Sequence, residues 1–252
     1  MVNLNITTMP SIPLDVLREI LGHVRKYDLP SLCRVNKIFC SCSQDFLYRE
    51  IKFEDEDVIQ TLSQSTDLAR RVRVFYIDDG CPQLATALQN MSSLRSLKFG
   101  FGFIGDESLL DGCTFKLESF SCNFPNSEPL QSFLISQPSL TNLTIWGEYE
   151  PLPPFDQRCL PNLTYVTANP SWLCMLIPGR PVREVDVVSS SRIDLSFFTL
   201  STTPIQKLWI CYDMLYPKPG SFLVPIFPSL VHLVVSAYDM EWAVRVPFCL
   251  YN

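Results

Sequence analysis

Hydrophobic and polar residues separate onto two sides of a predicted helix near the start of the chain, between Leu14 and Val24. At 100° per residue, the apolar side chains fall on one arc about 160° wide. A helix that packs on a single core needs an apolar stripe of only a little over 100°. The extra width predicts two apolar contacts, one with the helix's own small core and one with a partner's groove. The arc contains Leu14, Val16, Leu17, Ile20, Leu21 and Val24.

Residues 11 to about 50 are predicted to form three short helices. Ser11 can cap the first helix, and Pro13 is tolerated in its first turn, where the missing N–H group is not needed. Asp28 precedes a second run of apolar residues at helical spacing, and Ser43 is a candidate cap for the third helix. A core of about 40 residues is marginal alone, so this segment is expected to lean on a partner or a continuing domain.

From about residue 70 the hydrophobic pattern changes to a short unit, apolar-x-x-apolar-x-apolar, which occurs eight times. The starts of successive units lie 19 to 25 residues apart, which is the spacing of a leucine-rich solenoid. Stacking such units would align positions 1, 4 and 6 into one continuous core, because no single unit can bury its own apolar face. The units begin at Val72, Leu94, Leu117, Leu140, Leu163, Val182, Ile205 and Leu230.

Positions 3, 5 and 7 of each unit are expected to point away from that core. Large aromatic side chains at such positions are enriched in binding sites, and two carboxylates lie between them in the sequence. The resulting candidate substrate-binding patch consists of Trp146, Tyr165, Glu184, Asp186 and Trp209. The alternative is that loops or an irregular sheet cover these rings, which would make them part of a secondary core.

Composition excludes several classes of function. The chain has 252 residues, 47% of them hydrophobic, and a net charge of −6 without a basic run, which argues against nucleic-acid or membrane partners. We interpret the cysteines as reduced core thiols, and the start lacks a signal peptide, so cytoplasm and/or nucleus is the expected location. Only His23 and His232 are present, which removes most metal and catalytic-triad chemistry. Gly100 to Gly105 match G-x-G-x-x-G, but too little chain follows before the next predicted strand for a crossover helix, so no cofactor is expected. Because histidines are so few, we also expect no metal site and no enzymatic activity.

Segment 12–51 resembles the F-box, the motif by which substrate receptors join cullin–RING ubiquitin ligases. The similarity runs from IPLDVLREIL through DLPSLCRVNKIF to FLYREI, with Ile-Pro in place of the usual Leu-Pro start. The remainder resembles the degenerate leucine-rich repeats that often follow an F-box, and the YREIKF junction is similar to F-box proteins of mushroom-forming fungi. The resemblance implies that one set of apolar residues packs on a Skp-type adaptor, whereas the residues alone also fit the core of a small helical domain. This set is Ile12, Pro13, Leu17, Ile20, Leu21, Leu32 and Val35.

The sequence therefore predicts an α/β protein in which a three-helix F-box precedes an irregular leucine-rich-repeat solenoid with a curved parallel sheet. We expect an F-box-like domain at 11–51, an acidic linker and connecting helix at 52–69, and the solenoid at 70–252. The predicted function is that of a non-catalytic substrate receptor, which binds the adaptor, through it a cullin, and an unknown target protein. The alternative is a non-ligase scaffold in which the helical segment caps the repeats.

Overall fold

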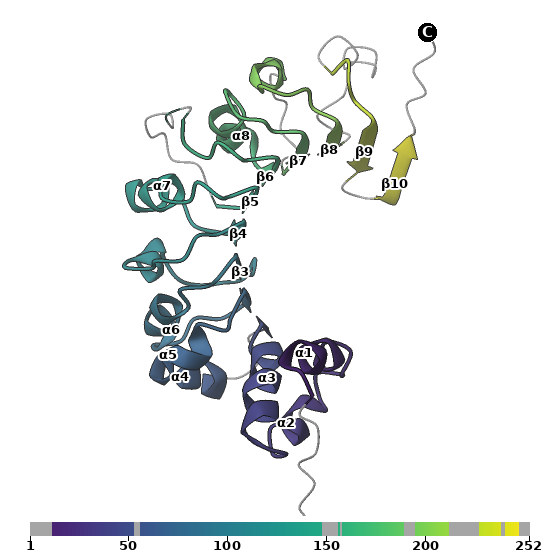
Figure 1. Cartoon of the computed structure of the whole chain (residues 1–252). Coiled ribbons are helices and arrows are strands. Elements are labelled where there is room, and N and C mark those ends of the chain that lie inside the picture. Colours follow the sequence, from purple (N-terminus) through teal and green to yellow (C-terminus); the bar gives the residue numbers. More distant parts are fainter. Residues whose placement is uncertain are drawn as a thin grey trace, which may run out of the picture.

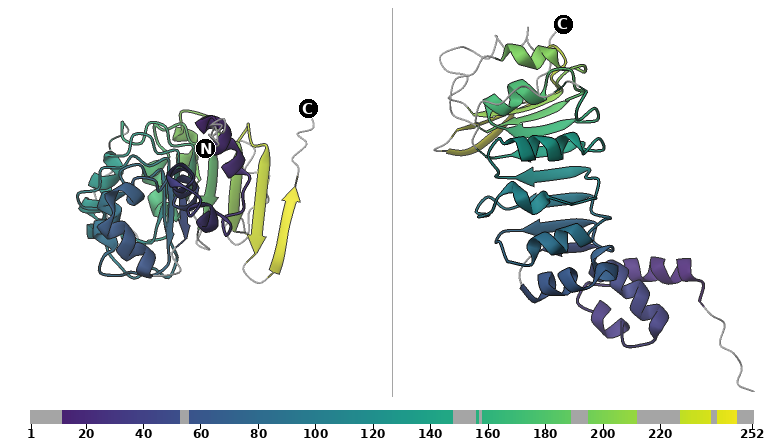
Figure 2. Two further views of the ribbon diagram at one scale, coloured as in Figure 1. Left: turned by 60° about the horizontal axis from the view of Figure 1, so that its bottom comes forward. Right: turned by 90° about the vertical axis from the view of Figure 1, so that its left-hand side faces the viewer.

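The computed structural model describes residues 12–52, 56–147, 156, 158–188, 195–211, 227–237 and 240–246. In these ranges, three short helices at the N-terminal end are followed by a long, curved sheet (Figure 1). The strands line the inner side of the curve and the helices that follow them lie on the outer side. Figure 2 shows the N-terminal helices projecting from one end of the stack of strands.

The three predicted N-terminal helices are present: α1 (Leu14–Gly22), α2 (Leu29–Leu32) and α3 (Lys37–Leu47). The predicted cap of the third helix was wrong, because Ser43 is buried inside α3. The actual cap is Asn36, whose side-chain oxygen accepts hydrogen bonds from the backbone N–H groups of Ile38 and Phe39 at 2.9 and 3.0 Å. The cap proposed at Ser11 lies outside the described residues.

The described strands form one sheet in which spatial order follows sequence order from β1 to β10. Neighbouring strands run parallel from β1 to β9, and β10 pairs antiparallel with β9. The sheet is not closed, because β1 and β10 each pair on one side only. The strands are β1 (Glu50–Lys52), β2 (Val74–Ile77), β3 (Ser96–Phe99), β4 (Ser119–Cys122), β5 (Asn142–Ile145), β6 (Tyr165–Ala168), β7 (Glu184–Val187), β8 (Lys207–Cys211), β9 (His232–Ala237) and β10 (Met240–Val246).

Short helices connect many of these parallel strands, as the crossover connections of a parallel sheet require. Those on the outer side are α4 (Glu56–Gln64), α5 (Thr66–Ala69), α6 (Leu84–Asn90), η1 (Glu107–Leu110), α7 (Glu128–Ile135), α8 (Pro170–Leu176) and η2 (Ser196–Leu200). In the part of the chain that the structure describes, no helix has both the length and the hydrophobicity needed to cross a bilayer.

Each of the eight predicted units overlaps one of the strands β2 to β9. Positions 1 and 4 of every unit are buried, and position 6 is buried in all but the last, where Val235 is half-buried. In register, Leu97, Phe120 and Leu143 are direct neighbours on successive strands, so their side chains form a continuous row in the core. Burying a side chain of this size stabilises the fold by roughly 1.5–3 kcal/mol before the entropy of ordering it is subtracted.

Two segments differ from the predicted organisation. The sheet begins at Glu50, ahead of the predicted start at 70, because β1 pairs with β2. Segment 56–69 was predicted as linker and connecting helix, but α4 and α5 contribute Ile59, Leu62 and Ala69 to the main core. This segment therefore belongs structurally to the sheet-containing part, and residues 53–55 of the predicted acidic linker lie outside the described residues.

A buried arginine joins the segment after α8 to the segment before β6. Arg180 is fully buried, and its guanidinium donates hydrogen bonds to four backbone carbonyl groups. The acceptors are Cys159 at 2.8 Å, Met175 at 2.8 Å, Pro178 at 3.1 Å and Asp156 at 3.0 Å. Burial lowers the pKa of this guanidinium below its ordinary value. Its role is structural, since its donors are used on the backbone.

Candidate functional site

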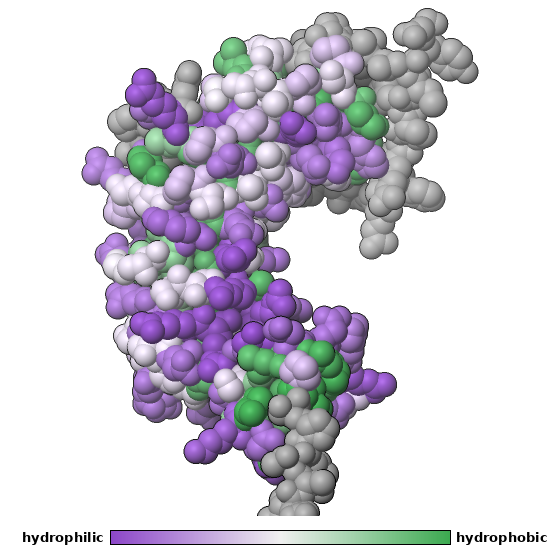
Figure 3. All heavy atoms as spheres, viewed as in Figure 1, coloured by the Kyte–Doolittle hydropathy of each residue, from purple (hydrophilic) through white to green (hydrophobic). Residues whose placement is uncertain are grey.

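Hydrophobic side chains remain exposed on the N-terminal helices and the segments that join them. Six of these side chains, each between 45% and 59% exposed, form what we call the apolar surface: Ile12, Leu14, Val16, Ile20, Val35 and Ile38. Figure 3 shows hydrophobic residues gathered over this end of the molecule. Isolated apolar side chains are common on protein surfaces, but a group of this size on one small helical unit is typical of a docking surface.

The wide apolar arc of α1 is divided between two environments. Leu17 and Leu21 are only 2% and 1% exposed and pack in a separate small core with Leu29 and Cys42. Val16 and Ile20, on one edge of the arc, stay exposed. The helix thus has one apolar contact already made and one still open, which are the two contacts that the width of the arc predicts.

The predicted adaptor-binding residues fall into the same two groups. Ile12, Pro13, Ile20 and Val35 are exposed and available to a partner. Leu17 and Leu21 are core residues and not part of the exposed face, because their side chains are enclosed by the other helices. Leu32 is half-buried and packs against the same core. Sequence reasoning missed Leu14, Val16 and Ile38 as exposed members, although the first two lie on the predicted arc.

The candidate substrate-binding residues lie on the face of the sheet opposite the core. The rings of Tyr165 and Trp209 contact edge to face at 6.4 Å between centroids, across β7. Asp186 pairs in register with Trp209, and burial raises the pKa of its carboxyl group. Glu184 forms an ion pair with Lys207 at 2.8 Å, so its charge is already compensated. The structure thus brings four of the five predicted residues together, all of them half-buried.

The fifth residue, Trp146, follows β5 and has a different neighbour. Its ring contacts that of Phe101 at 6.1 Å between centroids, and Phe101 is 75% exposed. Among the described ring contacts, none joins Trp146 to Tyr165 or Trp209. The glycine-rich segment that contains Phe101 forms a turn after β3: Gly100 lies so close to Asp78 that an added Cβ would be 1.9 Å from its carboxylate. This turn accounts for Gly100 without a phosphate ligand.

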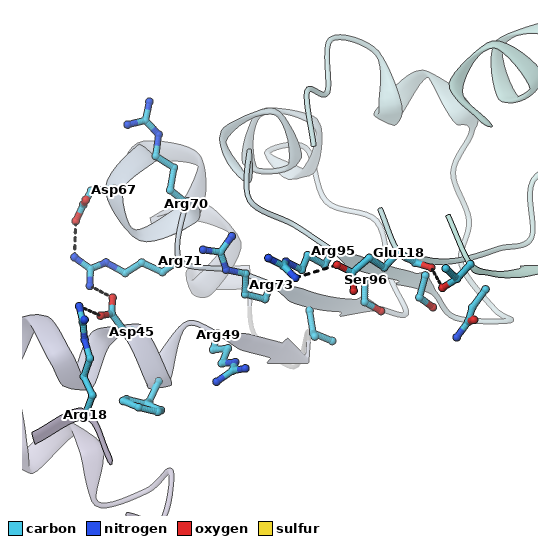
Figure 4. Close-up of a pocket in the computed structure, with 15 residues that line it drawn as sticks. Arg18, Asp45, Arg49, Asp67, Arg70, Arg71, Arg73, Arg95, Ser96 and Glu118 are labelled. Atoms are coloured by element: carbon cyan, nitrogen blue, oxygen red, sulfur yellow. Dashed lines mark hydrogen bonds and ion pairs between the residues drawn. The ribbon is translucent and has the colours of Figure 1, made fainter. Parts of the chain in front are cut away.

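A basic pocket of about 840 Å³ lies where the N-terminal helices meet the first strands (Figure 4). Arginine side chains dominate its lining, which also includes Asp45, Asp67 and Glu118. Arg71 joins the two parts of the molecule there, since it donates to Asp45 and to the Ser41 carbonyl on α3 and to Asp67 on α5. The arginines of the basic pocket are Arg18, Arg49, Arg70, Arg71, Arg73 and Arg95.

The described residues offer little for metal or thiol chemistry. No group of three or more His, Cys, Asp or Glu side chains among them is arranged to hold a metal ion. The eight cysteines whose side chains the structure describes are free, but of these only Cys42 and Cys122 are buried, as predicted for core thiols, and Cys174 is exposed. Burial raises the pKa of Cys113 and of Cys122 to about 12, which makes both poor nucleophiles at neutral pH.

A small helical unit with its own core and an unfilled apolar surface has the features of a protein-docking module. Residues 9–50 match the family model described as F-box domain. The match spans α1 to α3 and supports the identification of this segment as an F-box. No curated protein matches the sequence. F-box domains bind Skp-type adaptors and are generally non-catalytic parts of ligase complexes, which agrees with the apolar surface found here.

Proposed function

We propose that this protein is the substrate-recognition subunit of a Skp–cullin–F-box ubiquitin ligase. The apolar surface of α1 to α3 docks on the Skp-type adaptor, and the sheet-containing part holds a target protein. The exposed apolar side chains within the F-box match carry this proposal. Leaving these side chains in water costs free energy that a complementary groove recovers.

We further propose that the sheet-containing part is a leucine-rich-repeat solenoid. The near-constant spacing of β2 to β9, the burial of positions 1 and 4 of each unit and the outer helices support this. Its role in catalysis would be proximity, since holding a target near the ubiquitin-carrying enzyme raises the effective concentration of the target's lysines. No side chain of this chain would take part in the chemistry.

Adaptor binding by the purified chain tests the proposal. We expect wild-type protein to bind a Skp-type adaptor and the double variant Ile20→Asp, Val35→Asp to bind at least about tenfold more weakly, because two buried contacts are replaced by unpaired carboxylates. Both side chains are exposed in the free protein, so the variant should keep its fold, which circular dichroism would show.

A matched control carries the same chemical change elsewhere. Ile104 and Val231 are 90% and 70% exposed and lie outside the N-terminal helices. The double variant Ile104→Asp, Val231→Asp should bind the adaptor as wild type does. If folded wild-type protein does not bind the adaptor, the ligase role is refuted and a repeat scaffold, with a helical cap at one end, is what remains.

A further inference from the structure

The basic pocket collects charge that the rest of the chain lacks. Six of the thirteen arginines in the sequence line it, whereas the whole chain has a net charge of −6. Its three carboxylates leave the pocket with a net charge of +3. Grouping like charges opposes folding unless something compensates them, so the pocket favours an anionic ligand.

Not all of these arginines are engaged within the protein. Arg71 and Arg95 pair with carboxylates, Arg95 with Glu118 at 2.9 Å, and Arg73 donates to the Ser93 carbonyl at 2.8 Å. The side chains of Arg49 and Arg70 are exposed and form no hydrogen bond or ion pair with the described residues, although their backbone groups are hydrogen-bonded. In Figure 4, Arg49 just before β1 and Arg70 just after α5 lack the dashed contacts that Arg71 makes. Their planar guanidinium groups are free to bind an oxyanion through two hydrogen bonds each.

The shape of the pocket favours an extended ligand. Its floor includes Val74, Ser96, Ser119 and Asn142, which are register neighbours on the adjacent strands β2 to β5. Three strand-to-strand steps of about 4.8 Å span roughly 14 Å, which is the length of about four residues of extended peptide. A single small anion would fill one end only. The hydroxyl and amide groups along this floor supply neutral hydrogen-bonding partners for a peptide backbone.

We propose that the basic pocket binds an acidic segment of a partner protein through its oxyanions, which are carboxylates of Asp or Glu or phosphate monoesters of modified side chains. The pocket would thereby select the chemical class of target, a role that rests on the function proposed above. The binding itself does not depend on that function, so the two can be tested separately.

The test uses three pools of fluorescein-labelled peptides with the same randomised flanks and different central cores of glutamate, phosphoserine or glutamine. Fluorescence anisotropy with the full chain should show at least one anionic pool binding about tenfold or more tightly than the glutamine pool, with affinity that falls as salt rises. Comparing the glutamate and phosphoserine pools shows which source supplies the oxyanion.

The variants connect binding to the pocket. The double variant Arg49→Gln, Arg70→Gln should lose most of the preference for the anionic pool. It should keep its thermal stability, since neither side chain has a partner among the described residues. Arg183→Gln is the matched control: Arg183 is exposed and holds the same second position in its unit as Arg73 and Arg95, but lies outside the pocket. It should bind as wild type does.

Three results would overturn the inference: no preference for either anionic pool, equal loss in Arg183→Gln, or pyrophosphate binding at the pocket without peptide binding. Adaptor binding is measured on the same samples. Adaptor binding without anionic-peptide binding removes this inference and leaves the proposed function. If peptide binding requires Arg49 and Arg70 but the protein does not bind the adaptor, the peptide-binding site is supported and the ligase role is refuted.

Discussion

Replacing Arg180 by methionine should destabilise the protein more than any change of an exposed arginine. Methionine fills much of the same volume but removes all donors, leaving four carbonyl oxygens in a buried site without their hydrogen bonds. At the lower limit of about 1 kcal/mol for each unsatisfied acceptor, the loss is about 4 kcal/mol. Removing a buried charge returns part of its desolvation cost, so we take this lower limit as the expected net value.

The thermal midpoint should fall by roughly 8–16 °C for a loss of that size in a chain of this length. Arg180→Lys should recover little, because one ammonium group cannot reach carbonyls that the guanidinium contacts through three different nitrogens. Differential scanning calorimetry measures the midpoint, and hydrogen exchange at α8 and β6 shows whether the loss is local. Arg183→Met, at an exposed site, is the control. If the two methionine variants differ by less than about 0.5 kcal/mol, the structural role assigned to Arg180 is refuted.

Three further predictions concern the inner face and the thiols. Asp186→Asn should stabilise the protein near neutral pH, because burial raises the pKa of Asp186 in the native state. The native state then holds this proton at a pH where the unfolded chain has released it, so wild-type stability falls as pH rises through that window. Melting at pH 4 and pH 7 tests this, and a gain that does not grow with pH would contradict it. Leu208→Ala should lower the free energy of unfolding, measured in urea, by about 2–5 kcal/mol. Trp209→Ala, on the opposite face of β8, should lower it less, because of these two side chains Leu208 alone is fully buried. The reverse order would mean that Trp209 is a core residue. Iodoacetamide at pH 8 should label exposed Cys174 before Cys122, which is buried with a pKa of about 12, and mass spectrometry of native and unfolded samples would reveal any exception.

The repeating part of the fold was predictable because its hydrophobic pattern has a nearly fixed period. Strands β2 to β9 fall where the eight units were read, since each unit has the same alternation of inward and outward positions. Strand β1 was missed because it has three residues, two of them charged, and only Ile51 faces the core. Strand β10 was missed because its antiparallel pairing belongs to a hairpin with β9 and follows no repeat spacing.

The sites were predicted less well because they depend on how distant segments meet. The helical wheel showed that Leu17, Leu21 and Ile20 share one arc, but α2 and α3 decide which part of the arc is covered. The basic pocket had only a weak signal, the Arg-Arg-Val-Arg sequence at 70–73. Its other arginines come from α1, from the end of α3 and from the next strand unit, and nothing in their spacing predicts that they line one cavity.

The strand order from β1 to β10 also affects how the chain can fold during synthesis. Each strand pairs with the one that left the ribosome just before it, so every new strand finds its template already in place. Contacts between segments close in sequence form quickly, because little loop entropy is lost in closing them. The chain can therefore fold progressively from its N-terminal helices onward. At each stage, the unpaired edge at the growing end of the sheet is covered when the next strand emerges and pairs with it.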